Sequence, residues 1–276
     1  MTESQPTIFL SHGAGPSFFI STKDMPQLKG LDKDSAAADF FKTLVAKENL
    51  QEPKAILVIS AHWEERVPTV QTTKSPSLYY DYQGFPEATY RLSWPAPGAP
   101  DVALRVKTLL ESSGFKCNTN SERGFDHGVF VPLVLVYPEA RIAVCQLSLM
   151  GSLDVEDHLK LGEALAPLTQ ENVLIIGSGF TTHGGNMLEQ PGPAAPWTLE
   201  FQSWLHDVLT TPQYTADDRK QKLIRCKTNE FFRLAHPRIE HFLPIVVTLA
   251  ASGYRAGRVL FSEFFSKVGI LEHYMF

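Results

Sequence analysis

Residues 55–62 read AILVISAH, an apolar run that ends in two small residues and a histidine. Two further segments have a similar layout: residues 7–13 read TIFLSHG, and residues 173–185 read VLIIGSGFTTHGG. Short runs rich in Ile and Val are typical of strands buried in a parallel sheet. In open α/β sheets, the ligand site lies beyond the carboxyl ends of such strands. The sequence therefore predicts a sheet that delivers His12, His62 and His183 to one edge.

Segments with helical periodicity separate the strand-like segments along the chain. Helices are predicted over 35–50, 100–113, 154–166, 197–209, 217–227 and 239–252, and further strands over 67–73, 141–149 and 259–261. Strands that alternate with helices predict an α/β fold: a single-domain sandwich with a mostly parallel or mixed central sheet, covered by helices on both faces. We expect residues 1–276 to form one catalytic domain, since this length is compatible with a single α/β unit.

The bulk composition excludes several classes of partner. A net charge of −5 and a pI of about 6.0 argue against a nucleic-acid-binding surface. The longest apolar stretches contain proline and are too short to span a bilayer, so no membrane partner is expected. The cysteines Cys117, Cys145 and Cys226 are widely spaced and odd in number, as is typical of reduced thiols. The prediction is a cytoplasmic protein.

Histidines are the main candidates for chemistry, because imidazole is both the commonest metal-binding side chain and the natural acid–base group near neutral pH. His12 and His62 directly follow strands, as two of the roughly three ligands of a first-row metal would. His127 and His183 are either proton carriers or turn histidines, and Asp126 is either the orienting carboxylate of His127 or a helix N-cap. The remaining candidates for structural or surface roles are His158, His206 and His273.

Residues 235–244 read AHPRIEHFLP and contain His236, Glu240 and His241. Pro237 is predicted to start a helix that carries Glu240 and His241 in its first turn. Adjacent positions on a helix point about 100° apart. Only one of these two side chains is therefore expected to bind a metal directly.

The order of these motifs resembles that of the class III extradiol ring-cleaving dioxygenases, and most closely their 4,5-DOPA dioxygenase branch. The resemblance extends from Phe9 to about Gly253. It is carried by the segments 11–13 (SHG), 59–63 (ISAHW), 84–86 (GFP), 95–98 (PAPG), 124–128 (GFDHG), 146–148 (QLS), 178–179 (SG) and 240–244 (EHFLP).

The resemblance implies roles for five histidines. His12, His62 and His241 match the metal ligands, His183 matches the active-site base, and His127 matches a second acid–base histidine. Better-known class III enzymes use two histidines and a glutamate, whereas the DOPA dioxygenase branch uses a third histidine, so we predict His241 rather than Glu240. The implied metal is Fe(II) in the active enzyme, with zinc as an alternative occupant in a crystal, because zinc binds more tightly than iron.

The implied reaction opens the ring of a small aromatic diol, a catechol such as DOPA, with O2. Two alternatives use the same residues: a zinc-dependent hydrolase, in which the histidines would activate water, and a non-catalytic binding homologue. The segment 75–100 is rich in aromatic residues and proline, and is either a binding loop or a loop packed on the core. The aromatic side chains predicted as walls for a flat ring are Trp63, Tyr79, Tyr82 and Phe85.

Overall fold

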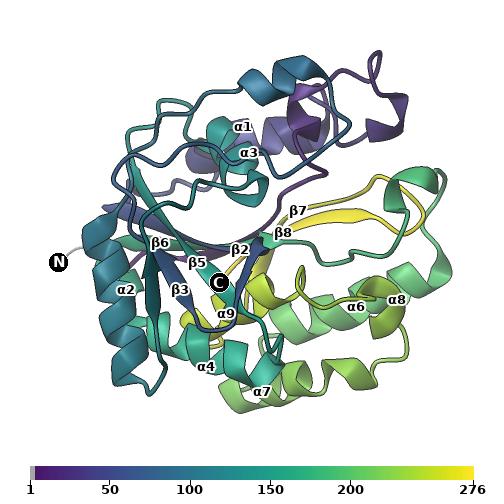
Figure 1. Cartoon of the computed structure of the whole chain (residues 1–276). Coiled ribbons are helices and arrows are strands. Elements are labelled where there is room, and N and C mark those ends of the chain that lie inside the picture. Colours follow the sequence, from purple (N-terminus) through teal and green to yellow (C-terminus); the bar gives the residue numbers. More distant parts are fainter. Residues whose placement is uncertain (1–3) are drawn as a thin grey trace.

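A computed structural model describes residues 4–276 as a mixed sheet with helices on both faces (Figure 1). In this part of the chain the sheet has eight strands in the order β4-β3-β5-β2-β6-β1-β8-β7. Strands β5, β2, β6 and β1 are mutually parallel, whereas β8 is antiparallel to β1. The strands are β1 (Thr7–Ser11), β2 (Ala55–Glu65), β3 (Thr69–Gln71), β4 (Asn118–Asn120), β5 (Ala143–Met150), β6 (Val173–Gly179), β7 (Arg258–Phe264) and β8 (Ile270–Met275). The predicted α/β class is confirmed.

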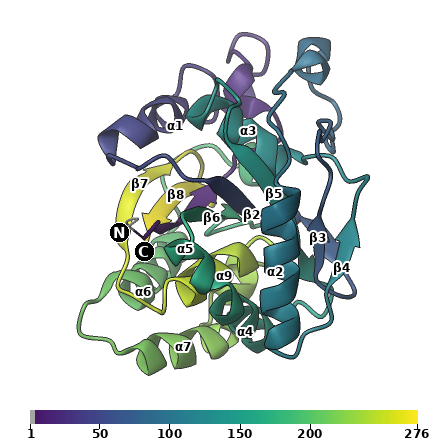
Figure 2. The ribbon, with the colours of Figure 1, turned by 90° about the vertical axis from the view of Figure 1, so that its left-hand side faces the viewer.

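The central strands are apolar on both sides because each contributes to two cores. In β2, Ile56 and Val58 face one core and Leu57 and Ile59 face the other. Helices α1 and α3 cover the first face, and α2, α4, α6 and α9 cover the second (Figure 2). Burial on both faces explains the uninterrupted apolar runs of the sequence.

Six helices, α1, α2, α4, α6, α7 and α9, fall close to the predicted ranges, whereas α3, α5 and α8 were not predicted. Several helix ends have capping residues. Ser35 caps α1 and Asp154 caps α4, each by accepting a backbone N–H. The helices are α1 (Ala36–Lys47), α2 (Pro100–Ser112), α3 (His127–Val136), α4 (Val155–Leu165), α5 (Pro167–Gln170), α6 (Pro196–Thr210), α7 (Ala216–Ile224), α8 (Phe232–Ala235) and α9 (Leu243–Ala251). Within residues 4–276, none of these helices combines the length and apolarity required to cross a membrane.

Strands β2, β4 and β8 and the start of helix α9 also differ from the sequence prediction, and β4 was not predicted. Strand β2 continues past His62 to Glu65, and its register against β5 shifts after Ile59. Strand β8 was not predicted, and it is the antiparallel neighbour of β1. Helix α9 begins at Leu243 instead of near Ile239, with a proline in its first turn. The segment that carries His241 is therefore a loop.

Candidate metal centre and active site

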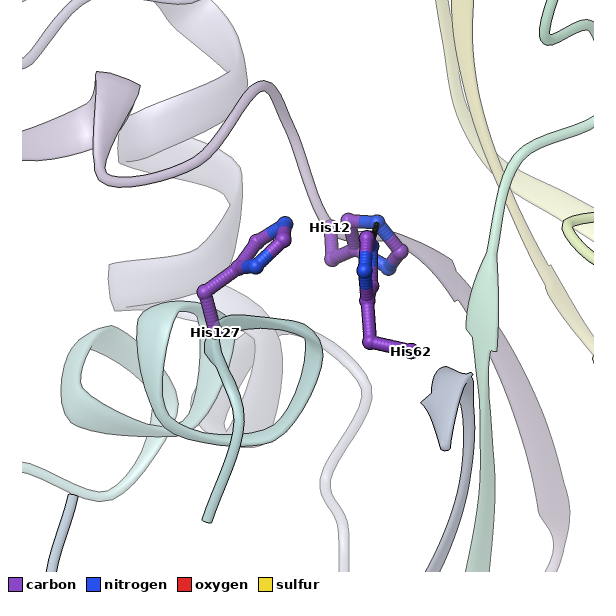
Figure 3. Close-up of side chains that lie close together, drawn as sticks. All are labelled: His12, His62 and His127. Carbon is purple, nitrogen blue, oxygen red and sulfur yellow. Dashed lines mark hydrogen bonds between the residues drawn. The ribbon is translucent and has the colours of Figure 1, made fainter. Parts of the chain in front are cut away.

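The predicted histidines converge at the carboxyl edge of β1, β2 and β6. His12 follows β1, and His62 lies near the end of β2 (Figure 3). Their Nε2 atoms are 3.1 Å apart, and the Nε2 atoms of His62 and His241 are 3.2 Å apart. Metal–nitrogen bonds of about 2.0–2.1 Å place adjacent ligand nitrogens roughly 3.0–3.4 Å apart. The spacing of these three Nε2 atoms fits ligands of one ion.

The second ring nitrogen of each histidine faces an oxygen. Nδ1 of His12 is 2.9 Å from Oγ of Ser178, and Nδ1 of His241 is 2.9 Å from Oε1 of Glu240. Nδ1 of His62 is 3.5 Å from Oδ2 of Asp81. A metal-binding histidine usually donates its other N–H to such a group, which fixes the tautomer. With Nδ1 protonated, three Nε2 lone pairs point at one another, an arrangement that a cation stabilises.

Burial keeps these imidazoles neutral. The pKa of His12, of His62 and of His241 lies well below the usual value, first because each ring is buried and then because other histidines are near. A neutral imidazole is the form that binds a metal. The environment of the three rings thus favours the ligand form over the imidazolium at neutral pH.

Glu240 and His241 are neighbours with different places in the centre. The carbonyl oxygen of His241 accepts a hydrogen bond from the N–H of Phe180, just after β6, at 2.9 Å. This contact holds the segment as a loop, so the predicted helix over 239–252 is wrong at its start. His241 presents Nε2 to the centre, and Glu240 lies behind it, with burial raising the pKa of its carboxyl group. The helical argument that only one of the pair can bind the metal therefore does not apply to this loop, and His241 as the third ligand stays a prediction.

His127 is the first residue of α3, and its ring centroid is 3.9 Å from that of His62 (Figure 3). Its Nδ1 is 2.8 Å from Oδ1 of Asp81. Asp126 is the N-cap residue of α3, as one of the two alternatives predicted, although its side chain makes no capping hydrogen bond; it is not the orienting carboxylate of His127. Instead, the Asp126 carboxylate is fully buried and accepts hydrogen bonds from Ser60 and Arg123. Asp126 thus has a structural role, because it links Arg123 to Ser60 of strand β2.

His183 lies on the other side of the centre, where its ring stacks on His241 at a centroid distance of 3.6 Å and an interplanar angle of 7°. Burial, and then the proximity of His127, lowers the pKa of His183 to about 4. The structure therefore brings all five predicted site histidines together. Donor atoms of His12, His62 and His127 lie within 4.8 Å of one another, and so do those of His183, Glu240 and His241.

A cavity of about 590 Å³ opens over the five histidines. Its apolar walls come from the end of β6 and from the loop that follows it, together with residues near His12 and His241. The apolar lining residues are Ala14, Phe180, Met187, Leu188 and Pro237. A flat aromatic ring can be enclosed by such walls. Besides the histidines, the polar lining residues are Asn186, Glu189, Arg238 and Glu240.

The predicted aromatic walls lie elsewhere. Trp63, Tyr79, Tyr82 and Phe85 are absent from the cavity lining among the described residues. The hydroxyl group of Tyr82 donates to the carbonyl of Thr89 in the same loop, so this loop is packed on itself and on the core. The packed alternative for the segment 75–100 is the one observed.

Two arginines lie near the centre in different settings. Arg123 pairs with buried Asp126 at 3.0 Å and also donates to the carbonyl of His62. Arg238 borders the cavity and donates two hydrogen bonds to the carboxylate of Glu64. Arg123 therefore has a structural role next to the candidate ligand His62, whereas Arg238 lies at the cavity mouth.

The other histidines have structural or surface positions, as predicted for three of them. His158 is buried and accepts the N–H of Met150, and His206 is exposed. His273 is fully buried in β8 and stacks on Phe40. Buried His236 contacts the carbonyl of Thr181 through Nε2.

Sequence reasoning missed Asp81 and did not assign Ser178 a role. Asp81 is the one acidic residue between Ser75 and Pro86, inside a run of tyrosines, and this isolated carboxylate is the only local signal. Ser178 lies where β6 ends, one strand away from His12 in the sheet. Only the paired strands bring it into contact with that ring.

Comparison with known proteins agrees with this geometry. Residues 6–270 match the family model of the catalytic LigB subunit of aromatic ring-opening dioxygenase, so the chain belongs to this family. It is accordingly an extradiol ring-cleaving dioxygenase, an oxidoreductase.

Two relatives and one solved structure resemble nearly the whole chain. The 4,5-DOPA dioxygenase extradiol of Beta vulgaris is 43% identical over 90% of this chain and 87% of its own length. The protein of the same name from Portulaca grandiflora is 42% identical over 87% of each chain. The crystal structure of an uncharacterized protein from Escherichia coli K12 superposes with a TM-score of 0.78 at 26% identity, covering 98% of this chain and 99% of the other.

Proposed function

We propose that this chain is a non-haem, Fe(II)-dependent extradiol dioxygenase that opens the ring of a catechol such as DOPA with O2. The observation that carries the proposal is the convergence of three Nε2 atoms, from His12, His62 and His241, at 3.1 and 3.2 Å. Each of these rings has its Nδ1 beside an oxygen. Residues 1–276 form one catalytic domain in this proposal.

The three histidines would hold the metal. A bound Fe(II) with three protein ligands supplies open positions for a diol and O2, and thereby the redox chemistry of ring opening. The protein's part is to bind the substrate, to exclude water and to move protons. The cavity over the centre, with Phe180, Met187 and Leu188 in its walls, provides apolar surfaces for a flat ring.

We assign His183 as the base that accepts a proton from the diol and His127 as the second acid–base residue. The lowered pKa of His183 leaves its ring unprotonated and able to accept a proton. His127 donates through Nδ1 to Asp81, which leaves its Nε2 for exchange with a substrate. The two histidines contact different candidate ligands, since His183 stacks on His241 and His127 packs against His62.

DOPA is the proposed substrate because the relatives from Beta vulgaris and Portulaca grandiflora carry that name. The compartment that we propose is the cytoplasm, since Cys117, Cys145 and Cys226 are buried free thiols.

The test is O2 uptake by anaerobically Fe(II)-loaded protein with DOPA and a panel of other catechols, read together with the spectrum of the product. Turnover with Fe(II) and none with redox-inert Zn²⁺ is expected. Activity that persists with Zn²⁺ and consumes no O2 would instead indicate a hydrolase.

Three alanine variants test the roles. His62→Ala is expected to lose metal binding and turnover together. His183→Ala keeps the metal but loses most turnover, by about 10²–10⁴-fold for an acid–base residue. His206→Ala, at an exposed position of α6, is the matched control and keeps both. A rate for His183→Ala within a few-fold of wild type would refute its assignment as the base.

A further inference from the structure

Asp81 lies in the site although no sequence motif identified it as a candidate. It lies in the loop between β3 and α2, and its side chain is only 11% exposed. Oδ1 accepts hydrogen bonds from both the backbone N–H and Nδ1 of His127, at 2.9 and 2.8 Å. Oδ2 is 3.5 Å from Nδ1 of His62. One carboxylate thus faces a candidate metal ligand and a candidate proton carrier at the same time.

We propose that Asp81 is a positioning residue that fixes the ring orientation and tautomer of His62 and His127 together. This inference deepens the proposed function and rests on it for the roles of the two histidines. In the contact with His127 the donor must be the histidine, because an ionised carboxylate only accepts hydrogen bonds. Nδ1 of His127 is then protonated. The contact with His62 is longer, at 3.5 Å, and there the negative charge beside Nδ1 favours a proton on that nitrogen, so that Nε2 of each ring is left as the free nitrogen.

The charge of Asp81 is maintained by the same contacts. Burial acts to raise its pKa, but the hydrogen bonds from His127 and the nearby His62 outweigh burial, so that the pKa lies below the usual value. The two hydrogen bonds that Oδ1 accepts from His127 favour the ionised carboxylate beside the rings that it orients. A carboxylate behind a metal-binding imidazole also makes that imidazole a better ligand.

The loop around Asp81 is held in place by its own tyrosines. The N–H of Tyr79 donates to the carbonyl of Phe125 at 2.7 Å, directly before α3. The hydroxyl groups of Tyr80 and Tyr82 donate to carbonyls further along the same loop, at 2.6 and 2.8 Å. These contacts explain why the loop is aromatic although it does not line the cavity: they support the carboxylate.

Two substitutions separate the two contacts of Asp81. In Asp81→Asn the amide oxygen still accepts from the backbone and ring of His127, which forces the amide N–H2 toward Nδ1 of His62, donor against donor. We expect Zn²⁺ affinity to fall by about 10-fold or more, while the His127 tautomer is kept. In Asp81→Ala both contacts are lost, so the His127 tautomer becomes mixed and kcat falls more than KM changes.

Zn²⁺ affinity is measured by competition with a chelator, and the tautomer by ring ¹H–¹⁵N correlations of ¹⁵N-histidine-labelled, Zn²⁺-loaded protein, with His127→Gln for assignment. Asp32→Asn and Asp32→Ala are the matched controls. Asp32 is also a buried aspartate that accepts two backbone N–H groups, from Gly30 and Asp34. Both controls are expected to keep Zn²⁺ affinity within about twofold and to leave the His127 signals unchanged.

Two results would overturn the inference: an unprotonated Nδ1 on His127 in the wild-type protein, or wild-type Zn²⁺ affinity in Asp81→Asn. The first needs no variant, so it decides even if Asp81→Ala does not fold. Failure of the proposed function has a different signature: no catechol is opened by the wild-type protein, while its tautomer and the loss of Zn²⁺ affinity in Asp81→Asn are as expected.

Discussion

Gly179, the last residue of β6, sets the distance between the sheet and the loop of His241. A Cβ atom at this position would lie 2.2 Å from the carbonyl oxygen of His241, whereas ordinary van der Waals contact begins at 3.4 Å. In Gly179→Ala that carbonyl must therefore retreat by about 1.2 Å, a shift larger than the roughly 0.5 Å tolerance of a functional site. The hydrogen bond from Phe180 to the same carbonyl is strained by this movement.

We expect Gly179→Ala to lose stability and metal affinity together. Overpacking of this kind costs about 1–3 kcal/mol of unfolding free energy, and a misplacement of about 1 Å at a site costs about 10²-fold in rate. Urea unfolding of the metal-free protein measures the first effect. Chelator competition with Zn²⁺, together with O2 uptake by the Fe(II)-loaded protein, measures the second.

Gly162→Ala is the matched control for the steric clash. Its Cβ would lie 2.4 Å from the carbonyl oxygen of Val247, in the middle of α9 and away from the ligand loop. The two variants should be destabilised to a similar degree, but only Gly179→Ala should lose Zn²⁺ affinity, by at least about 10-fold. Equal affinities in the two variants would show that the Gly179 contact does not position His241.

Three further outcomes are expected. Zn²⁺ at about 100 times its Kd should raise the unfolding free energy by about 2.7 kcal/mol in wild type and not in His62→Ala. Urea denaturation with and without chelator measures this difference. Equal stabilisation of both proteins would show that the ion binds elsewhere. Burial lowers the pKa of His236 to about 3, so the unfolded chain binds a proton that the folded protein does not, and stability present above about pH 6.5 is lost as the pH falls toward 3. His236→Gln should make this loss shallower by about 1.4 kcal/mol per pH unit between pH 6 and 4. Parallel plots of unfolding free energy against pH for the two proteins would contradict the assignment. Arg123→Met leaves the Asp126 carboxylate buried without its cation and should cost about 3–5 kcal/mol, whereas adding Asp126→Asn to it should recover part of that loss in the same unfolding assay.

Most of the sheet could be predicted because its central strands are buried on both faces and therefore appear as apolar runs. Strand β8 escaped this reasoning because Glu272 and His273 interrupt its apolar pattern while both are buried. Glu272 is accommodated by hydrogen bonds from Gln202 and Ser262, contacts that only the folded chain creates. A buried ionisable side chain with partners distant in the sequence leaves no local pattern to detect.

The start of α9 shows a similar limit. Pro237 and Pro244 are both suited to the first turn of a helix, and the sequence does not distinguish them. The structure selects Pro244, because the carbonyl of His241 is engaged by Phe180 and the preceding segment is held as a loop. The residues of the site show the same limit. Its histidines could be predicted from sequence motifs, whereas the role of Asp81 depends on a contact with His127, 46 residues away in the sequence.

The position of β1 in the sheet has a consequence for how the protein is made. β1 carries His12 at its end, yet its neighbours are β6 and β8, which leave the ribosome much later. The N–H of Phe276 donates to the carbonyl of Thr7, and that of Thr7 to the carbonyl of Phe276, so the pairing of β1 extends to Phe276. During synthesis β1 therefore has unpaired edges, which are prone to aggregation until β6 and β8 emerge. A chain that stops before Ile270 would therefore contain every histidine of the centre, but its strand β1 would lack the neighbouring strand β8.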